Sequence, residues 1–257
     1  MQATDHLRDH SRHNHARENA QAWIKTAILF ALGFYFIYVI ASGSLSNYIN
    51  VRFEWLSYVA AGLFLLLGAA SLLDVIGQRG HDHDHHDHTH SGMSWPALAI
   101  VAIPLILGTL IPSRPLGSAA VGGSISLNAV SAAGAQPFMT DSLKWNVLDW
   151  LRAFNNSGDV SSFNGKQADV IGFVYREAAF ADNQFMAARF IISCCVADAG
   201  AIGVPVQWDA AADYPADTWV RIQGTWEVGE FRGDTVPILH PTNIEKVDQP
   251  EHPYLYP

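Results

Sequence analysis

The residues best suited to chemistry in this sequence are a run of histidines and aspartates in its first half. His81, His83, His85, His86, His88 and His90 are interspersed with Asp82, Asp84 and Asp87. Imidazole and carboxylate groups are ligands that zinc and other divalent transition metals accept. Because the run is continuous, it offers many interchangeable ligand sets and no single defined site. We therefore predict weak, exchangeable binding of zinc or another divalent transition metal, and a solubilising loop without a metal role is the alternative.

A second group of histidines lies in the amino-terminal tail. If this tail is helical, the spacing of His6, His10 and His13 places their imidazoles on one face, and His15 follows closely. Two imidazoles on one helix face can share a metal ion. A polar tail whose histidines do not act together is the alternative.

The two cysteines of the chain, Cys194 and Cys195, are neighbours. Consecutive Cα atoms are ~3.8 Å apart, which is below the usual disulfide range. Three interpretations stay open: buried core cysteines, a strained vicinal or intermolecular disulfide, and a second metal site. In the third, Cys194, Cys195 and Asp198 lie at the end of a strand, where a bulge brings them towards a soft metal.

Catalytic motifs are absent from the sequence. It contains no GxSxG, no HExxH and no phosphate-binding glycine loop. We therefore expect a protein that is not an enzyme and requires no cofactor.

The elements that position these residues begin with three charge-free runs, residues 26–42, 55–73 and 93–113. Each is close to the ~20 residues that span a bilayer. Trp23, Trp55 and Trp95 lie at their starts, where interfacial anchors occur. The sequence predicts three transmembrane helices surrounded by membrane lipid.

The number of spans determines which segments share a side of the membrane. Two spans separate the amino-terminal tail from the histidine loop, so both face the same compartment, and a third span puts the carboxy-terminal half opposite. The positive-inside rule makes the side with more basic residues cytoplasmic. That side carries Arg8, Arg12, Arg17, Lys25 and Arg79, against Arg52 and Arg114 on the other. We expect a cytoplasmic histidine loop and an extracytoplasmic carboxy-terminal domain in the cell membrane.

The three runs lack ionisable residues at their centres, and such residues usually mark an ion path. Small residues in the second run, such as Gly68 and Ala69, allow close approach of another helix, either from a partner or from within the chain. We therefore expect that this chain does not transport a solute alone.

The carboxy-terminal half has a different composition and predicts a mainly-β domain. Residues 142–156 have a helical pattern with Asp141 or Ser142 as the N-cap, and alternating segments follow at 168–176, 184–195, 203–208, 219–228 and 235–239. A turn is expected at Gly233-Asp234. About five strands bent by glycines predict a small OB-like Greek-key barrel preceded by one amphipathic helix, with a β-sandwich as the alternative.

The domain organisation follows from these segments. We predict a polar histidine-containing tail (1–22), a membrane region with three transmembrane helices (23–113) that includes the loop 78–92, a Gly/Ala/Ser-rich linker (114–141) and a soluble β-rich domain (142–257). Residues 142–257 carry eight Lys and Arg against fifteen Asp and Glu. Because phosphate backbones require a basic surface, nucleic acid is excluded as a partner.

Three stretches resemble a known bacterial family. They are RFIISCCVADAGAIGVPVQW (189–208), DTWVRIQGTWEV (217–228) and VPILHPTNIEKVDQPEHPYLYP (236–257). Together with the preceding spans, they are similar to the YcgQ-like subunits of two-component permease complexes. The resemblance implies two to three spans, a carboxy-terminal domain of unknown function and a separate polytopic permease subunit as partner, and it supplies no substrate.

The functional hypothesis that follows is a non-catalytic accessory subunit of a membrane permease complex, for a divalent metal or small solute, with a histidine loop that binds metal weakly. A stand-alone membrane-tethered metal-binding or sensing protein is the second hypothesis. An extracytoplasmic thiol-dependent enzyme that uses Cys194 and Cys195 is the third.

Overall fold

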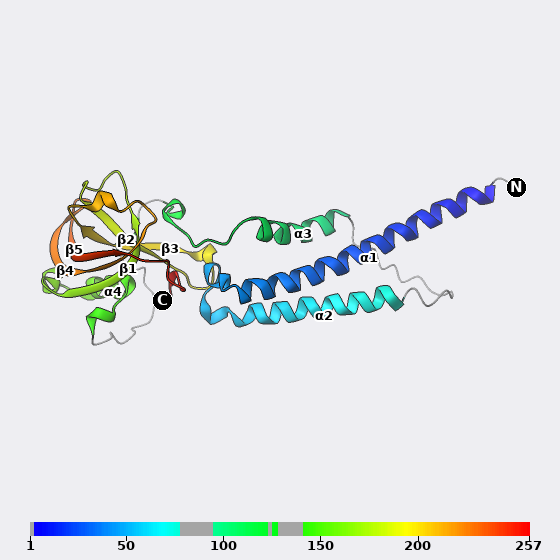
Figure 1. The fold of residues 1–257 in the computed structure, drawn as a ribbon, viewed down its shortest axis with the longest axis horizontal. Helices are drawn as coiled ribbons and strands as arrows, with labels where there is room; N and C mark the ends of the chain where they lie inside the picture. The colour runs from blue at the N-terminus through cyan, green and yellow to red at the C-terminus, as the bar shows by residue number, and fades with distance from the viewer. Residues whose placement is uncertain (1–2, 78–94, 123–124, 128–140) are drawn as a thin grey trace. The chain divides into compact units, whose positions relative to one another are not determined.

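The computed structural model describes residues 3–77, 95–122, 125–127 and 141–257 (Figure 1). Its side chains are described from residue 19 onward. The chain forms two compact units. The first contains residues 1–45 and 52–113, and the second contains residues 46–51 and 114–257.

The first unit is helical. Its helices are α1 (Ala3–Ala41), α2 (Trp55–Gly77) and α3 (Trp95–Leu110). The segments 19–41 and 51–77 are long and apolar enough to cross a membrane, as the sequence predicts. Helix α3 lies where the third span is expected but has 16 residues. At 1.5 Å per residue it extends about 24 Å, which is less than the ~30 Å hydrocarbon core.

Helix α2 packs against α1 through small residues on one face. Ser57, Ala61 and Gly68 are buried on α2, whereas Gly62 and Ala69 are exposed. A Cβ atom on Gly68 would lie 3.3 Å from the ring of Phe30 on α1. These contacts support the interpretation that part of the small-residue face serves packing within the chain.

The second unit contains a mixed six-stranded sheet, preceded by the helix α4 (Val147–Asn156). The strand order is β1-β4-β5-β3-β2-β6, and β1 also pairs with β2. Strands β1 to β5 are therefore joined in a closed series of pairings, in which the β3–β5 pair is parallel and the other four are antiparallel. The strands are β1 (Gln167–Tyr175), β2 (Gln184–Ile191), β3 (Gly200–Gln207), β4 (Trp219–Phe231), β5 (Asp234–Lys246) and β6 (Tyr254–Leu255).

The hairpin between β4 and β5 differs from the sequence prediction by one residue. Phe231 pairs with Asp234, so the turn consists of Arg232 and Gly233 and not of Gly233-Asp234. Their φ values of 58° and 86° are both positive, as a type I′ turn requires. Arginine is not typical at a positive φ, so the sequence pattern favoured Gly233-Asp234 as the turn.

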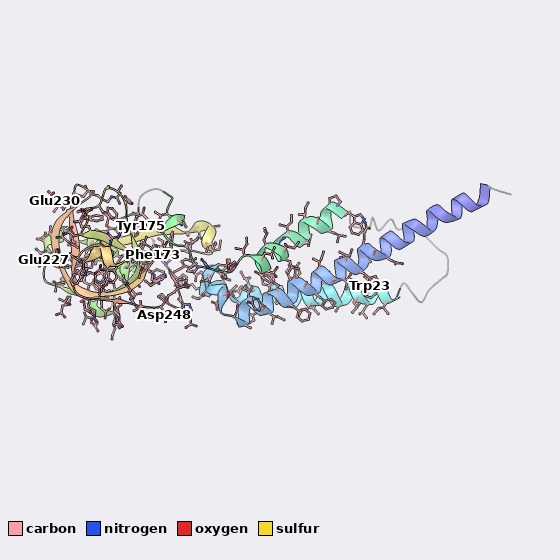
Figure 2. The ribbon with its side chains drawn as sticks, turned by 45° about the horizontal axis from the view of Figure 1, so that its top comes forward. Trp23, Phe173, Tyr175, Glu227, Glu230 and Asp248 are labelled. Carbon is pink, nitrogen blue, oxygen red and sulfur yellow. The ribbon has the colours of Figure 1, made fainter. Side chains whose placement is uncertain are left out.

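Strand β2 is buried on both faces of the sheet. Along β2, Phe185 and Ala187 belong to one hydrophobic cluster, and Met186 and Ala188 belong to another. The second cluster also contains Phe173 and Tyr175 of β1 (Figure 2). Both sets of alternating side chains of this strand therefore contribute to packing.

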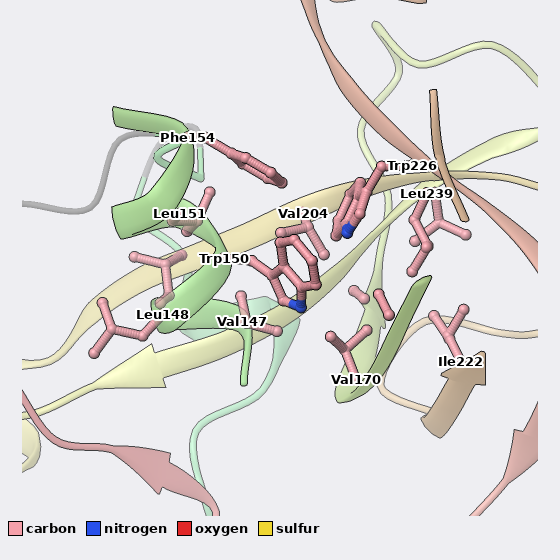
Figure 3. Packing of buried hydrophobic residues seen from close by; sticks show 14 of the residues in the cluster. Val147, Leu148, Trp150, Leu151, Phe154, Val170, Val204, Ile222, Trp226 and Leu239 are labelled. Atoms are coloured by element: carbon pink, nitrogen blue, oxygen red, sulfur yellow. The ribbon is translucent and has the colours of Figure 1, made fainter. Parts of the chain in front are cut away.

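Helix α4 covers the first cluster and begins later than predicted. Its N-cap is Asn146 and not Asp141 or Ser142, which cap or begin a short 3₁₀ turn instead. The Asn146 side chain accepts hydrogen bonds from the N–H groups of Leu148 and Asp149, and the Asp149 carboxylate accepts one from the N–H of Asn146. The apolar face of α4 packs against the sheet, where the rings of Trp150 and Trp226 are 5.1 Å apart (Figure 3).

Candidate functional site at the cysteine turn

The predicted histidine and aspartate ligands lie outside the described residues. This applies to His81, Asp82, His83, Asp84, His85, His86, Asp87, His88 and His90. The backbone of the amino-terminal histidines lies in α1, and their side chains are not among those described. Across the side chains that the structure does describe, no three His, Cys, Asp or Glu residues are grouped to hold a metal ion.

The other predicted site residues lie in a turn between β2 and β3, residues 192–199, which we name the cysteine turn. β2 ends at Ile191, so Cys194 and Cys195 do not continue the strand as predicted. The Asp198 carboxylate accepts hydrogen bonds from the N–H groups of Ser193, at 3.0 Å, and of Cys194, at 2.8 Å. The N–H of Asp198 donates to the carbonyl of Cys195 at 3.1 Å. Asp198 therefore folds the turn by bonding its backbone.

The two thiols are close together and accessible. Cys194 is exposed and Cys195 is half-buried, so the interpretation as buried core cysteines is wrong. Their Sγ atoms are 3.6 Å apart, and the two cysteines are not joined by a disulfide.

The electrostatics of the turn keep Cys194 protonated. Hydrogen bonds with the Asp198 carboxylate and with Cys195 raise the pKa of the Cys194 thiol to about 11. Burial acts to raise the pKa of Asp198, but hydrogen bonds from the N–H and thiol of Cys194 and from neighbouring N–H groups outweigh it and lower that pKa. A thiolate is the form that attacks electrophiles and binds metals, so this arrangement disfavours both reactions at Cys194.

The cysteine turn also binds a segment that is distant in sequence. Residues 46–51, which connect α1 to α2, belong to the second unit. We name them the 46–51 loop. The N–H of Asn50 donates to the carbonyl of Cys194 at 3.0 Å, and its Nδ2 donates to the carbonyl of Ser193 at 2.8 Å. The N–H of Val196 donates to the carbonyl of Tyr48 at 2.9 Å.

The burial of Asn50 shows that this attachment is part of the fold. Its exposed fraction is 2%, and its neighbour Ile49 forms a β-bridge with Cys195. The sequence alone gave no indication of this role, because a single asparagine in a short connection matches no motif. Asn50 and Ser193 are more than 140 positions apart in the sequence, and a local sequence pattern does not reveal a contact over such a separation.

The carboxy-terminal end joins the same region. The hydroxyl of Tyr254 donates to the carbonyl of Asn47 at 3.0 Å and accepts from the N–H of Leu116 at 3.0 Å. Burial raises the pKa of Tyr254, so the hydroxyl keeps the proton it donates. One side chain therefore holds both the 46–51 loop and the segment that follows α3.

Arg189 is a buried charge that sequence reasoning did not single out. Its exposed fraction is 6%, and its guanidinium donates to the carbonyls of Pro253 (3.1 Å), Ile171 (3.3 Å) and His252 (2.9 Å). The guanidinium also lies over the ring of Trp219, 5.1 Å from its centroid. Burial lowers its pKa to about 10, so it remains charged at neutral pH.

A shallow pocket lies on a different part of the sheet. It has a volume of about 270 Å³ and is lined by residues of β1, β4 and β5, including Asp169, Gln223 and Thr242. Asp169 forms a bidentate ion pair with Arg221, at 2.8 and 2.6 Å, and accepts from Gln223 at 3.0 Å. The carboxylate is thus already satisfied by protein donors.

Comparison with known protein families matches both units. The DUF1980 N-terminal domain matches residues 24–125, and the DUF1980 C-terminal domain matches residues 143–257. The chain belongs to the DUF1980 family. The resemblance predicted from the cysteine turn and the carboxy-terminal residues is confirmed.

Two curated relatives are similar to this DUF1980 protein over nearly their whole length. One, from Streptococcus mutans serotype c, is named "Putative two-component membrane permease complex subunit"; it is 25% identical over 88% of this chain and 95% of its own. The other is the UPF0703 protein YcgQ of Bacillus subtilis strain 168, 24% identical over 89% of this chain and 97% of its own. The cysteine turn and the 46–51 loop both lie within the regions that the DUF1980 domains match.

Proposed function

We propose that this protein is a non-catalytic accessory subunit of a two-component membrane permease, anchored by three spans and carrying an extracytoplasmic β domain. The family membership and the name of the Streptococcus mutans relative support a permease partner. The observation that carries the membrane arrangement is the attachment of the 46–51 loop to the cysteine turn.

This attachment supports a third membrane crossing despite the short length of α3. The 46–51 loop lies between two membrane-spanning helices, on the side opposite the amino-terminal tail. Because the loop bonds to Cys194 and Val196, the β domain is on that same side. With two crossings the β domain would be on the side of the tail, so the chain must cross once more between α2 and the sheet. Helix α3 is the apolar segment available for this crossing.

The distribution of basic residues supports the orientation. Arg8, Arg12 and Arg17 lie in the tail, whereas Arg52 and Arg114 flank the spans on the side of the β domain. The positive-inside rule then makes the tail and the histidine loop cytoplasmic. In this orientation the histidine loop, with weakly bound zinc or another divalent metal, faces the cytoplasm.

The strand pairings support an OB-like barrel. In the closed circuit β1-β2-β3-β5-β4, each strand pairs with two neighbours, so a small sheet has no free edges. Strand β6 pairs with β2 outside this circuit. The β domain exposes acidic side chains, such as Glu227 and Glu230 on β4 and Asp248 after β5 (Figure 2). This charge disfavours nucleic acid and favours a protein partner or a small ligand.

The composition of the helices supports the need for a partner. Between Lys25 and Asp74, the parts of α1 and α2 that lie within the membrane contain no ionisable side chain other than tyrosine. Three apolar helices offer no polar route for an ion, so the transport path belongs to a polytopic subunit. A stand-alone membrane-tethered metal-binding protein is the second candidate, and the histidine run favours it.

Co-purification from native membranes tests the proposal. We expect an affinity-tagged chain, extracted in mild detergent, to recover one polytopic membrane protein in stoichiometric amount. A matched control chain lacking residues 81–90 should recover the same protein, because the partner is bound by the spans and the β domain. Recovery of no polytopic protein by either chain would contradict the accessory-subunit proposal and favour the stand-alone protein.

Zinc binding tests the role of the histidine loop separately. The intact chain should bind several zinc ions weakly, and the chain lacking residues 81–90 should lose most of them. Equal zinc binding by the two chains would remove the metal role from the loop while leaving the permease proposal intact.

A further inference from the structure

The peptide unit between Cys194 and Cys195 combines two features that no other described part of the chain combines. The two residues that it joins carry accessible thiols, with Sγ atoms 3.6 Å apart. Its backbone holds the 46–51 loop, because the carbonyl of Cys194 accepts the N–H of Asn50 at 3.0 Å and Cys195 forms the bridge with Ile49. Any covalent change between the two sulfurs therefore acts on the backbone that attaches the loop.

We propose that Cys194 and Cys195 form a reversible dithiol–disulfide modification site that controls attachment of the 46–51 loop. Oxidation joins the two Sγ atoms and removes two electrons and two protons from the thiols. The electrons pass to the disulfide of a thiol–disulfide oxidoreductase, which is reduced to its dithiol form. Cys195 attacks the disulfide of the oxidoreductase and forms a mixed disulfide. Cys194 then loses its proton and attacks the Cys195 Sγ, which releases the second thiol of the oxidoreductase.

Formation of this bond changes the backbone because the ring is small. A disulfide has an S–S length of ~2.05 Å and prefers Cα atoms 4.4–6.8 Å apart, whereas consecutive Cα atoms are ~3.8 Å apart. Closing the sulfurs from 3.6 Å therefore twists the peptide between them. The carbonyl of Cys194 lies in this peptide, so the twist weakens its hydrogen bond with Asn50. Strained, exposed disulfides are easily reduced, which makes the change reversible.

The surroundings of the sulfurs are suited to a controlled reaction. Asp198 holds the N–H groups of Ser193 and Cys194, so the turn stays folded while the adjacent peptide changes. The hydrogen bond from Cys194 to Asp198 raises the pKa of this thiol, so little thiolate forms at neutral pH and Cys194 reacts slowly with oxidants in solution. Its attack on Cys195 in the mixed disulfide is helped by proximity, because the two Sγ atoms are 3.6 Å apart. The inference does not depend on a permease partner, because both sulfurs and the loop belong to this chain.

The experiment uses the full-length protein in detergent, equilibrated with mixtures of oxidised and reduced glutathione. Mass spectrometry of the peptide that contains both cysteines should show loss of two hydrogen atoms, reversed by excess reduced glutathione. Amide hydrogen exchange of residues 46–51 should accelerate roughly ten-fold in the oxidised form, as expected when one or two backbone hydrogen bonds are lost.

Two variants serve as controls. Cys195→Ser removes the second sulfur, so oxidant should leave exchange of the loop unchanged. Asn50→Ala removes the side-chain bond to Ser193, so exchange should be fast in the reduced form. The proposal is overturned if the native peptide gains only a glutathione adduct or an intermolecular link. It is also overturned if the vicinal disulfide forms while exchange of residues 46–51 stays the same.

Discussion

Replacement of Arg189 by methionine tests how the β domain holds its carboxy-terminal end. The guanidinium donates three hydrogen bonds, of 2.9, 3.1 and 3.3 Å, to backbone carbonyls in β1 and before β6. Hydrogen bonds to charged groups contribute about 1.5–3 kcal/mol each. Replacing the guanidinium also removes the free-energy cost of burying its charge, so the net loss of stability is smaller than the sum of the three hydrogen bonds.

We therefore expect Arg189→Met to lower the free energy of unfolding by about 2–4 kcal/mol, since methionine fills the space but leaves the carbonyls without their donor. For a chain of this size the loss corresponds to a decrease in Tm of roughly 5–15 °C. Tryptophan fluorescence of the full-length protein in detergent measures it, and Trp219 beside Arg189 is a local reporter.

Arg221→Met is the matched control. The Arg221 side chain is 47% exposed and pairs with the partly buried Asp169, so its loss should lower the free energy of unfolding by less than the loss of Arg189. A Tm for Arg189→Met within about 1 °C of the native value would refute the reasoning that the guanidinium-to-carbonyl bonds stabilise the domain.

Three further predictions concern other parts of the fold. Gly68→Leu should separate α1 from α2, because even a Cβ atom at this position lies 3.3 Å from the ring of Phe30. Gly62→Leu is the control, because its Cβ atom meets open space. Crosslinking between the two helices should decrease in the first variant and not in the second. Asn146→Ala should destabilise the domain by about 1 kcal/mol in thermal unfolding through loss of the helix cap, and an unchanged Tm would contradict this. The folded-state pKa of Asp198 is lowered, so its stabilisation is present above the unfolded-state pKa and is lost as the pH falls through the folded-state value. Amide exchange of Cys194, corrected for the intrinsic pH dependence, should therefore accelerate below about pH 4, and a flat profile would contradict the assigned role.

The elements of this fold that depend on local pattern could be predicted from the sequence. The charge-free runs predicted α1 and α2, because a bilayer-spanning helix requires about 20 apolar residues. Alternation predicted the strands, but their ends were less accurate. β2 was expected to continue to Cys195 because apolar residues follow Ile191, whereas hydrogen bonds to Asp198 turn the chain there.

The attachment of the 46–51 loop could not be predicted because its determinants lie far apart in sequence. Asn50 bonds to Ser193 and Cys194, and nothing near Asn50 distinguishes it from other polar residues in a loop. The role of Tyr254 depends likewise on partners at both ends of the chain. These contacts are visible only in the folded structure, and they support the proposed third membrane crossing.

The measurement that tests the account most directly is the sidedness of the tail and the β domain. In a background with Cys194→Ser and Cys195→Ser, one variant carries Ser11→Cys in the tail and another carries Ala210→Cys at an exposed position of the β domain. A membrane-impermeant maleimide applied to intact cells should label Ala210→Cys at once and Ser11→Cys after permeabilisation only. Labelling of both variants under the same condition would contradict three crossings, and labelling of Ala210→Cys only after permeabilisation would contradict the proposed extracytoplasmic β domain.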